Sequence, residues 1–380
     1  MRQDTVVSAS YLKRLIRQSL RAQGFEITKD RITLHVNNKE ALRQVHTLAV
    51  AAEVKRAELA LRPHEEHLLT YIANGEEVFP ERIHPMLIAV EPGTDYARLF
   101  RYARLHWSIP VSSGYGRRFG FVLIDENNGK LIGVLGLSDP IFSLRVRDDW
   151  IGWESEQHKQ RLFHVMDAYV LGAVPPYSRL LCGKFVAMIA TSREIRQVFR
   201  DRYMGSETLI QRRQRPAELA LVTTTSALGR SSLYNRLKFH DRLLLQSVGY
   251  TTGWGTFHFA NGVYEKMLAF AHRHCTGTAK AARWGGGQFR SRKEVIRKCL
   301  QVLGFHHSWM LHRVKREVFV APLARNTQAF LRGETEYLDC WDESIMTYFD
   351  YFRERWLLPR VERDPAYKNF RREVWRLWPT

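Results

Sequence analysis

The chain has 380 residues, of which 45% are hydrophobic and 12% aromatic, so it can bury a substantial core and lacks the composition of a disordered protein. Its 58 Lys and Arg against 39 Asp and Glu give a formal net charge of +19, which favours a polyanionic partner, with DNA or RNA first. No apolar run reaches about 18 residues and the N-terminus lacks an apolar signal-peptide core, so we expect a cytoplasmic protein without a membrane span.

Residues 1–80 are predicted to form a helical module. Ser10 can cap a first helix with apolar residues on one face, and Gly24 follows the end of that helix. A longer helix is predicted over residues 38–61, just before a proline.

Residues 81–260 are predicted to form a mixed-sheet domain of the α/β or α+β class. Two apolar runs flank an Asn-Gly pair, which indicates a hairpin over residues 119–137. The remaining predicted elements follow in this order: a strand at 86–91, a helix at 97–106, a strand at 168–174, a helix at 179–190, a strand at 219–222, a short helix around Tyr234, and a last strand near 243–250. Residues 261–380 are predicted to form a basic, aromatic-rich helical region.

The strand at 219–222 ends in a loop of Thr, Ser and Gly residues, and a short helix follows. An open α/β sheet binds its ligand at such a strand end, so a binding site is expected there. The four cysteines form no CxxC pair or Cys/His zinc pattern, so a metal site has no sequence support, and the cofactor stays unknown.

Asp148 and Asp149 lie in the densest cluster of reactive side chains, residues 145–153. Carboxylates beside arginines could act as catalytic acid and base, or with Glu154 could hold Mg²⁺ for a nuclease or strand transferase. The alternative is an Arg–Asp pair that fixes a loop, since adjacent aspartates point in different directions in a strand and in a helix.

Two segments are candidates for nucleic-acid binding because they combine glycine, aromatic and basic residues. The first is residues 249–259, where Tyr250 and Trp254 offer stacking surfaces. The second surrounds a glycine triplet and continues along a basic helix, with the candidate residues Arg283, Trp284, Arg290, Arg292, Lys293, Arg297, Lys298, Arg313, Lys315 and Arg316. The alternatives are a tight turn in the first case and a solvated basic face in the second.

The order of elements over residues 86–256 resembles the GNAT acyltransferase fold, as does the segment SSLYNRLKF at residues 231–239. The resemblance implies a general acid at Tyr234 and an acyl-CoA pyrophosphate bound near Arg179 and Lys184. The phosphate-binding loop of that fold needs small residues so that backbone N–H groups can approach the phosphates. Here Cys182 and Lys184 occupy those places, which puts acyl-CoA use in doubt.

Four segments resemble the DruA family of the Druantia anti-phage defence system: residues 147–192, 221–237, 250–259 and 312–326. The resemblance implies a bacterial defence component that acts with other proteins, among them a helicase-like protein, and it supplies no catalytic residues. The leading hypothesis is therefore a DNA-binding defence component. A GNAT-like transferase that modifies a nucleic acid or a small molecule is the first alternative, and a metal-dependent nuclease or strand transferase is the second.

Overall fold

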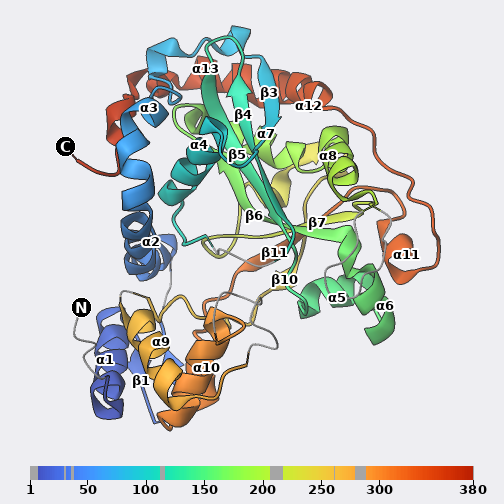
Figure 1. Ribbon diagram of the computed structural model, residues 1–380. Coiled ribbons are helices and arrows are strands. Elements are labelled where there is room, and N and C mark those ends of the chain that lie inside the picture. The colour runs from blue at the N-terminus through green and yellow to red at the C-terminus, as the bar shows by residue number, and fades with distance from the viewer. Residues whose placement is uncertain are drawn as a thin grey trace.

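A seven-stranded mixed sheet forms the centre of the molecule (Figure 1). The computed structural model describes residues 7–29, 31–35, 38–111, 116–205, 217–260, 262–278 and 288–379. The strands follow the order β10-β11-β7-β6-β5-β4-β3, and every neighbouring pair is antiparallel except β6 and β7, which are parallel. Their bounds are Pro85–Ala89 (β3), Arg118–Asp125 (β4), Lys130–Ser138 (β5), Val165–Ala173 (β6), Leu221–Thr225 (β7), Gln246–Tyr250 (β10) and Glu317–Pro322 (β11). The predicted mixed α/β fold is confirmed.

The predicted hairpin is the pair β4 and β5, joined at the Asn-Gly turn. Gly129 in this turn has a φ of +68°, a backbone conformation that glycine adopts without strain. Nearly every residue of both strands is buried, because helices cover both faces of the sheet. This explains why the two strands are continuous apolar runs and do not alternate with polar residues. A short hairpin of β8 (Lys238–Phe239) and β9 (Arg242–Leu243) precedes β10.

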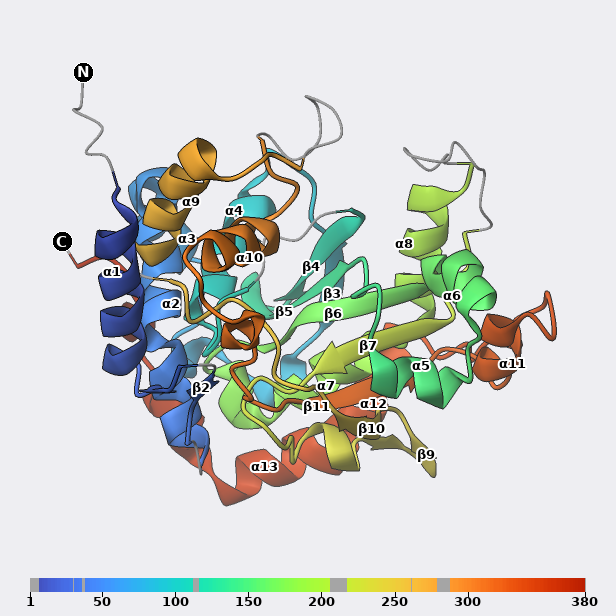
Figure 2. The same ribbon diagram turned by 90° about the horizontal axis from the view of Figure 1, so that it is seen from below.

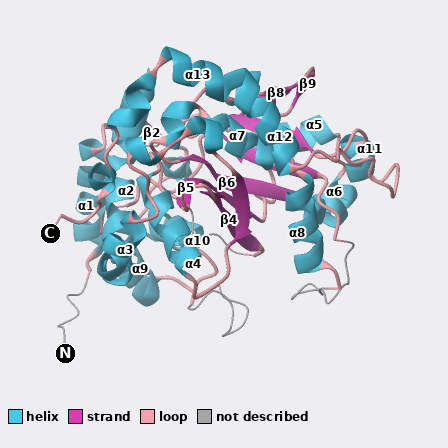
Figure 3. Ribbon diagram, turned by 90° about the horizontal axis from the view of Figure 1, so that it is seen from above, coloured by secondary structure: helices cyan, strands magenta, loops and turns pink. Residues whose placement is uncertain are grey.

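Helices pack on both faces of the sheet (Figure 3). One face carries α7 (Cys182–Ile189), α8 (Arg193–Tyr203), α12 (Ile345–Phe352) and α13 (Leu358–Arg363). The other face carries α3 (Glu65–Leu69) and α4 (Asp95–Ala103) over β4 and β5, and α5 (Arg145–Ile151), α6 (Ser155–Arg161) and α11 (Thr327–Arg332) at the other end of the sheet. The helix predicted around Tyr234 is a single 3₁₀ turn, Tyr234–Arg236.

A second, smaller core joins two segments that are far apart in the sequence. It contains α1 (Ala9–Ala22), the hairpin β1 (Glu26–Ile27) and β2 (Ile32–Thr33), α9 (Val263–His274) and α10 (Arg292–Val302). We call residues 7–35 and 251–316 the small body; the second range is an insertion between β10 and β11. Figure 2 shows α1 and α9 side by side. Ser8 and not Ser10 caps α1, since its hydroxyl accepts from the amide of Tyr11 at 3.2 Å.

The long helix α2 (Lys39–Leu61) leads from the small body to the sheet. The C-terminal end of the chain packs beside α3, which follows this helix. The carboxylate of buried Glu65 accepts from the amide of Leu377 at 2.7 Å and from the hydroxyl of Tyr102 at 2.8 Å. The domain limits at residues 80 and 260 stay predictions. Among the described residues, no helix is both long enough and apolar enough to cross a bilayer.

Candidate nucleic-acid interface

The segment after β10 and the segment before β11 pair with each other into a two-stranded ribbon, residues 250–254 and 311–316. The amide of Arg313 donates to the carbonyl of Gly253 at 3.0 Å, and Trp254 forms an antiparallel bridge with the opposite strand. Gly253 has a φ of +77°, and a Cβ there would lie 2.6 Å from the backbone of Arg313. Only glycine fits at this crossing, so the glycine-rich sequence has a structural cause.

Two aromatic and two basic side chains of the ribbon are open to solvent. Tyr250 is 46% exposed and Trp254 is 39% exposed, which is unusual for large rings. Arg313 and Lys315 are exposed on the opposite strand, and no carboxylate in the described part of the chain forms a salt bridge with them. Rings can stack on bases and unpaired cations can contact phosphates, so the structure brings these four predicted residues together in one place.

Arg316, the next predicted residue, has a different environment. Its guanidinium donates to Nε2 of His46 on α2 at 3.2 Å, and burial lowers the pKa of Arg316. Burial, together with the charge of Arg316, lowers the pKa of His46 to about 3, so this histidine is neutral and can accept the bond. Arg316 therefore connects the ribbon to α2, and the structure does not place it with the exposed cations.

The histidine that Arg316 contacts belongs to a buried cluster of three. His46, His258 and His312 surround the ring of Phe257, which lies 4.3 Å from His46 and 4.7 Å from His312 between ring centroids. Burial is the main cause that lowers the pKa of His258 to about 4 and of His312 to about 2. The three neutral rings pack together, so the cluster connects α2 (His46), the ribbon (His312) and the rest of the small body (His258).

The predicted basic helix is α10, which begins after the N-cap Ser291. Lys293 and Arg297 are exposed, and Lys298 is half-buried. Arg292 lies 4.0 Å above the ring of Tyr264 and donates to a backbone carbonyl at 2.8 Å, so it supports the helix start. The exposed Arg290 donates to a carbonyl at 3.0 Å, while Arg283 and Trp284 lie outside the described residues.

Positive charge is concentrated on the small body. Its sequence holds 18 Lys and Arg against four Asp and Glu, a net charge of +14 out of the +19 of the whole chain. In its described part, one Lys or Arg forms a salt bridge, Arg297 with Glu294 at 3.5 Å. The arginines around the sheet are instead widely paired, for example Arg372 with Glu77 at 2.6 Å and Arg242 with Glu343 at 2.9 Å. The excess charge is therefore available on the small body.

Helix α1 is a basic surface that the sequence analysis does not predict. Lys13, Arg14, Arg17 and Arg21 line one shallow hollow on the helix. The signal was present, because four cations and no acid occur in a helix of 14 residues. The pattern of apolar residues predicts the buried face of this helix, and the same helix carries the four cations on its polar face.

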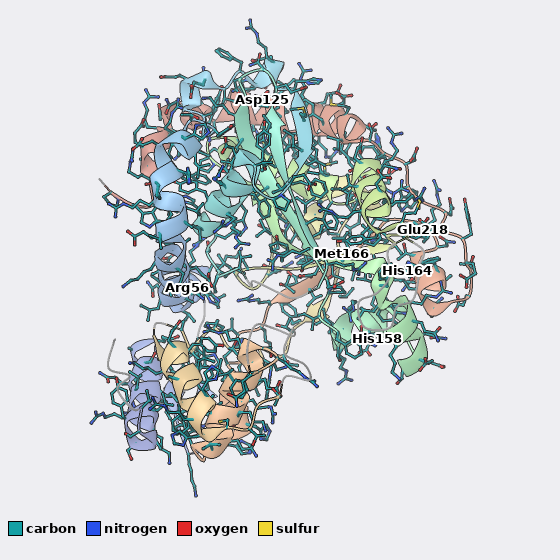
Figure 4. The ribbon with its side chains drawn as sticks, in the orientation of Figure 1. Arg56, Asp125, His158, His164, Met166 and Glu218 are labelled. Carbon is teal, nitrogen blue, oxygen red and sulfur yellow. The ribbon has the colours of Figure 1, made fainter. Side chains whose placement is uncertain are left out.

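The aspartates predicted to be catalytic do not converge. Asp148 accepts from the amide of Leu144 at 2.9 Å and from Nε of Arg147 at 2.8 Å. Asp149 is 67% exposed and pairs with Arg145 on the same helix. Asp148 also lies 4.0 Å from His158 on α6, which is labelled in Figure 4. Asp148 thus holds the start of α5, as in the alternative of a loop-fixing ion pair.

The three carboxylates that the nuclease hypothesis assigns to Mg²⁺, Asp148, Asp149 and Glu154, have separate roles. Glu154 caps α6. Within the described residues, no group of three or more His, Cys, Asp and Glu is arranged to hold a metal ion.

The residues predicted to bind acyl-CoA phosphates have other partners. Arg179 donates to the carbonyl of Ala366 at 3.0 Å, and Nζ of Lys184 lies 4.9 Å above the ring of Trp356. A Cβ at Gly183 would lie 3.5 Å from Leu233, so that side chain packs over the loop where phosphates would approach. The residues present do not fit an acyl-CoA pyrophosphate, and we derive no step through that cofactor.

Tyr234 lies on the same side of the sheet as α7, and its ring packs 5.3 Å from that of Phe319. Burial raises the pKa of Tyr234 to about 12.

Asp167 on β6 is a second titratable group on the sheet, and the sequence analysis does not predict it. It lies at the place where β6 and β7 separate. It accepts from the hydroxyl of Thr223 at 2.8 Å, and burial raises its pKa to about 6.

Fold and site together define a mixed α/β protein that carries most of its net positive charge on a helical body inserted at one edge of its sheet. The sequence matches the family model of the Druantia protein DruA over residues 36–333. A Druantia protein DruA from Escherichia coli (strain UMEA 4076-1) is 37% identical over 362 residues, which cover 94% of this chain and 89% of that protein. The chain belongs to the DruA family and is thereby a component of the Druantia anti-phage system. No solved structure matches it.

Proposed function

We propose that this DruA-family protein binds DNA through the ribbon and the basic small body, as part of an antiviral defence in the cytoplasm. The observation that carries the proposal is that the exposed side chains of Tyr250, Trp254, Arg313 and Lys315 all lie on one two-stranded ribbon. Exposed rings beside unpaired cations are the combination with which proteins hold single-stranded nucleic acid. The uneven charge of the small body supports the same conclusion, since unpaired cations attract a polyanion over long range.

Partner proteins are part of the proposal. Membership of the Druantia system implies further defence proteins, and we include a helicase-like protein among the proposed partners. DNA handed between such components would have to be held without strong sequence preference. Phosphate contacts and stacking supply binding of that kind, because neither depends on the base sequence.

The test is binding of a fluorescent single-stranded DNA, measured by anisotropy over a range of salt concentrations. Replacing Trp254 by Ala should weaken binding by about 1–3 kcal/mol, the contribution of one stacked base. The double change Arg313→Gln and Lys315→Gln should reduce the slope of log affinity against log salt by about 1.4, since each phosphate contact contributes about 0.7 with single strands.

Two control variants separate local loss from general effects. Tyr337→Ala removes a ring that is 70% exposed, and Arg325→Gln removes an exposed arginine that is paired with Asp339, both near α11. Neither should change the affinity for DNA. The proposal fails if the unchanged protein binds no DNA at low salt, if it prefers RNA of the same sequence, or if Trp254→Ala behaves like Tyr337→Ala.

The resemblance to the GNAT sheet also stays a proposal. It is supported by the strand order and by the separation of β6 and β7 after three paired residues. The contacts of Arg179, Lys184 and Gly183 do not support acyl-CoA binding, so a transferase is not put forward as a second function.

A further inference from the structure

Helix α1 exposes a stripe of unpaired positive charge. Leu12, Ile16 and Leu20 face the core, while the opposite side carries the hollow lined by Ser10, Lys13, Arg14, Arg17, Gln18 and Arg21. No carboxylate of the described residues forms a salt bridge with these four cations. Cations three, four and eight positions apart follow one side of a helix. The stripe thus offers a row of cations to an extended anion.

The stripe continues across the small body. The guanidinium of Arg17 lies 5.2 Å above the ring of Phe305, which lines a second hollow together with Lys29, Arg297 and His306. This second hollow contains cations and hydrogen-bonding groups from three separate segments. The two hollows meet at the contact of Arg17 with Phe305, so the basic surface is larger than one helix face.

The stripe and the ribbon differ in chemistry. Tyr11 is the single large hydrophobic residue of α1 that is exposed, at 40%, and Arg14 lies 5.9 Å from its ring. With four cations and one exposed ring, the stripe suits the phosphates of a duplex, whose bases are stacked inside and offer no face. The ribbon has two exposed rings, which need unstacked bases.

A short chain of contacts connects the stripe and the ribbon. The rings of Phe305 and Trp309 lie 4.2 Å apart, and the carbonyl of the following residue, Met310, accepts from the amide of Gly255, next to Trp254. Both surfaces therefore belong to the small body and are positioned by the same core.

We propose that α1 is a second DNA-binding site, specific for the duplex backbone, and that the protein recognises a junction between duplex and single-stranded DNA. The stripe on α1 holds the phosphates of the duplex, and the ribbon holds the unpaired bases that leave it. This inference rests on the proposed DNA binding and names the structure of DNA that the two surfaces select. Two sites on one body bind a forked molecule more tightly than either of its arms, because binding of the second arm is intramolecular.

The experiment compares three probes with the full chain: a blunt duplex, a single strand and a fork made from both. One variant carries Lys13→Gln, Arg14→Gln and Arg21→Gln; it spares Arg17, which packs on Phe305. This variant should weaken duplex and fork binding and lower the salt slope for the duplex by about 2.7, and it should weaken single-strand binding far less, through the reduced net charge alone. Trp254→Ala should do the opposite, with a loss of about five- to 150-fold for the single strand and no change for the duplex.

A matched control removes two arginines of α2 that are already paired, Arg43→Gln and Arg62→Gln. It should leave all three affinities unchanged. Helix content and melting temperature of the α1 variant show that it is folded. If the α1 variant binds the duplex like the unchanged protein, or if the fork binds no tighter than its stronger arm, the inference is wrong while DNA binding through the ribbon can still hold. If no probe binds to the unchanged protein, both proposals fail.

Discussion

The buried histidine cluster should make the stability of this protein fall steeply below neutral pH. His46, His258 and His312 are neutral in the folded protein, with pKa values of about 3, 4 and 2, lowered chiefly by burial. In the unfolded chain their pKa is about 6.5. The unfolded state then binds more protons below that pH, so the free energy of unfolding decreases as pH falls and is unaffected above it.

The size of the effect follows from these values. Between pH 7.5 and pH 5.5 each histidine should cost about 1.4 kcal/mol, and the three together about 4 kcal/mol. The result does not depend on the separate folded-state values, since all three lie well below pH 5.5. Asp167 acts in the opposite direction: burial raises its pKa to about 6, so its uptake of a proton in the folded state returns about 0.8 kcal/mol over the same interval.

The measurement is urea denaturation at the two pH values and constant ionic strength, followed by the fluorescence of the 10 tryptophans. The variant His258→Gln isolates the effect. Its amide can still donate to the carbonyl of Trp309, as the ring now does over 2.9 Å, but it takes up no proton. The loss of stability between the two pH values should shrink by about 1.4 kcal/mol in this variant.

A histidine that stays in solvent serves as the control. His307→Gln changes an exposed side chain, so its loss of stability between the two pH values should equal that of the unchanged protein. If His258→Gln also shows the full loss, the ring of His258 is not held neutral by burial and the reasoning is wrong.

Three further changes test local contacts by the same denaturation assay at pH 7.5. A Cβ at Gly75 would lie 2.1 Å from the carbonyl oxygen of Tyr367, so Gly75→Ala should cost about 1–3 kcal/mol through overpacking, and a neutral result would mean that the C-terminal segment does not pack there. Glu65→Ala leaves the amide of Leu377 without its acceptor, while the hydroxyl of Tyr102 keeps the carbonyl of Trp375, so the change should cost about 1–3 kcal/mol, together with faster proteolysis of the chain end. Ser291→Ala removes the N-cap of α10 and should cost about 1 kcal/mol, against a few tenths for Ser291→Gly; equal costs would contradict the capping role.

Much of the sheet could be predicted because most of its strands have a local sequence signal. The apolar runs on both sides of the turn at Gly129 indicate β4 and β5 without knowledge of the rest of the fold. The sequence EVFVAP of β11 is an apolar run too, but its place in the sheet between β7 and β10 depends on a return of the chain after an insertion of 66 residues, 251–316, which no local pattern predicts.

The site could be predicted only in part, for a similar reason. Tyr250 and Trp254 were found from their glycine-rich surroundings, and Arg313 and Lys315 from local charge. That these residues share a ribbon depends on pairing between distant segments. The interior position of Arg316 depends on His46, which is 270 residues away in the sequence, and no local pattern contains that information.

The connection of the small body to the sheet also limits how DNA contact can affect the rest of the molecule. The insertion leaves and re-enters at β10 and β11, and β10 is an edge strand of the sheet. Around the sheet, arginines are widely neutralised by carboxylates, whereas a net charge of +14 stays on the small body. A polyanion bound to the small body would therefore act on the sheet mainly through the ribbon and through the contact of Arg316 with His46 on α2. Because that guanidinium contacts a neutral ring and not a carboxylate, its positive charge is not neutralised within the protein and adds to the positive charge of the ribbon.

Replacing His46 by Asp would pair the charge of Arg316 inside the protein. We expect this variant to fold but to bind DNA less tightly at the ribbon, in the same anisotropy assay. Unchanged affinity would show that the charge of Arg316 is not felt at the ribbon surface.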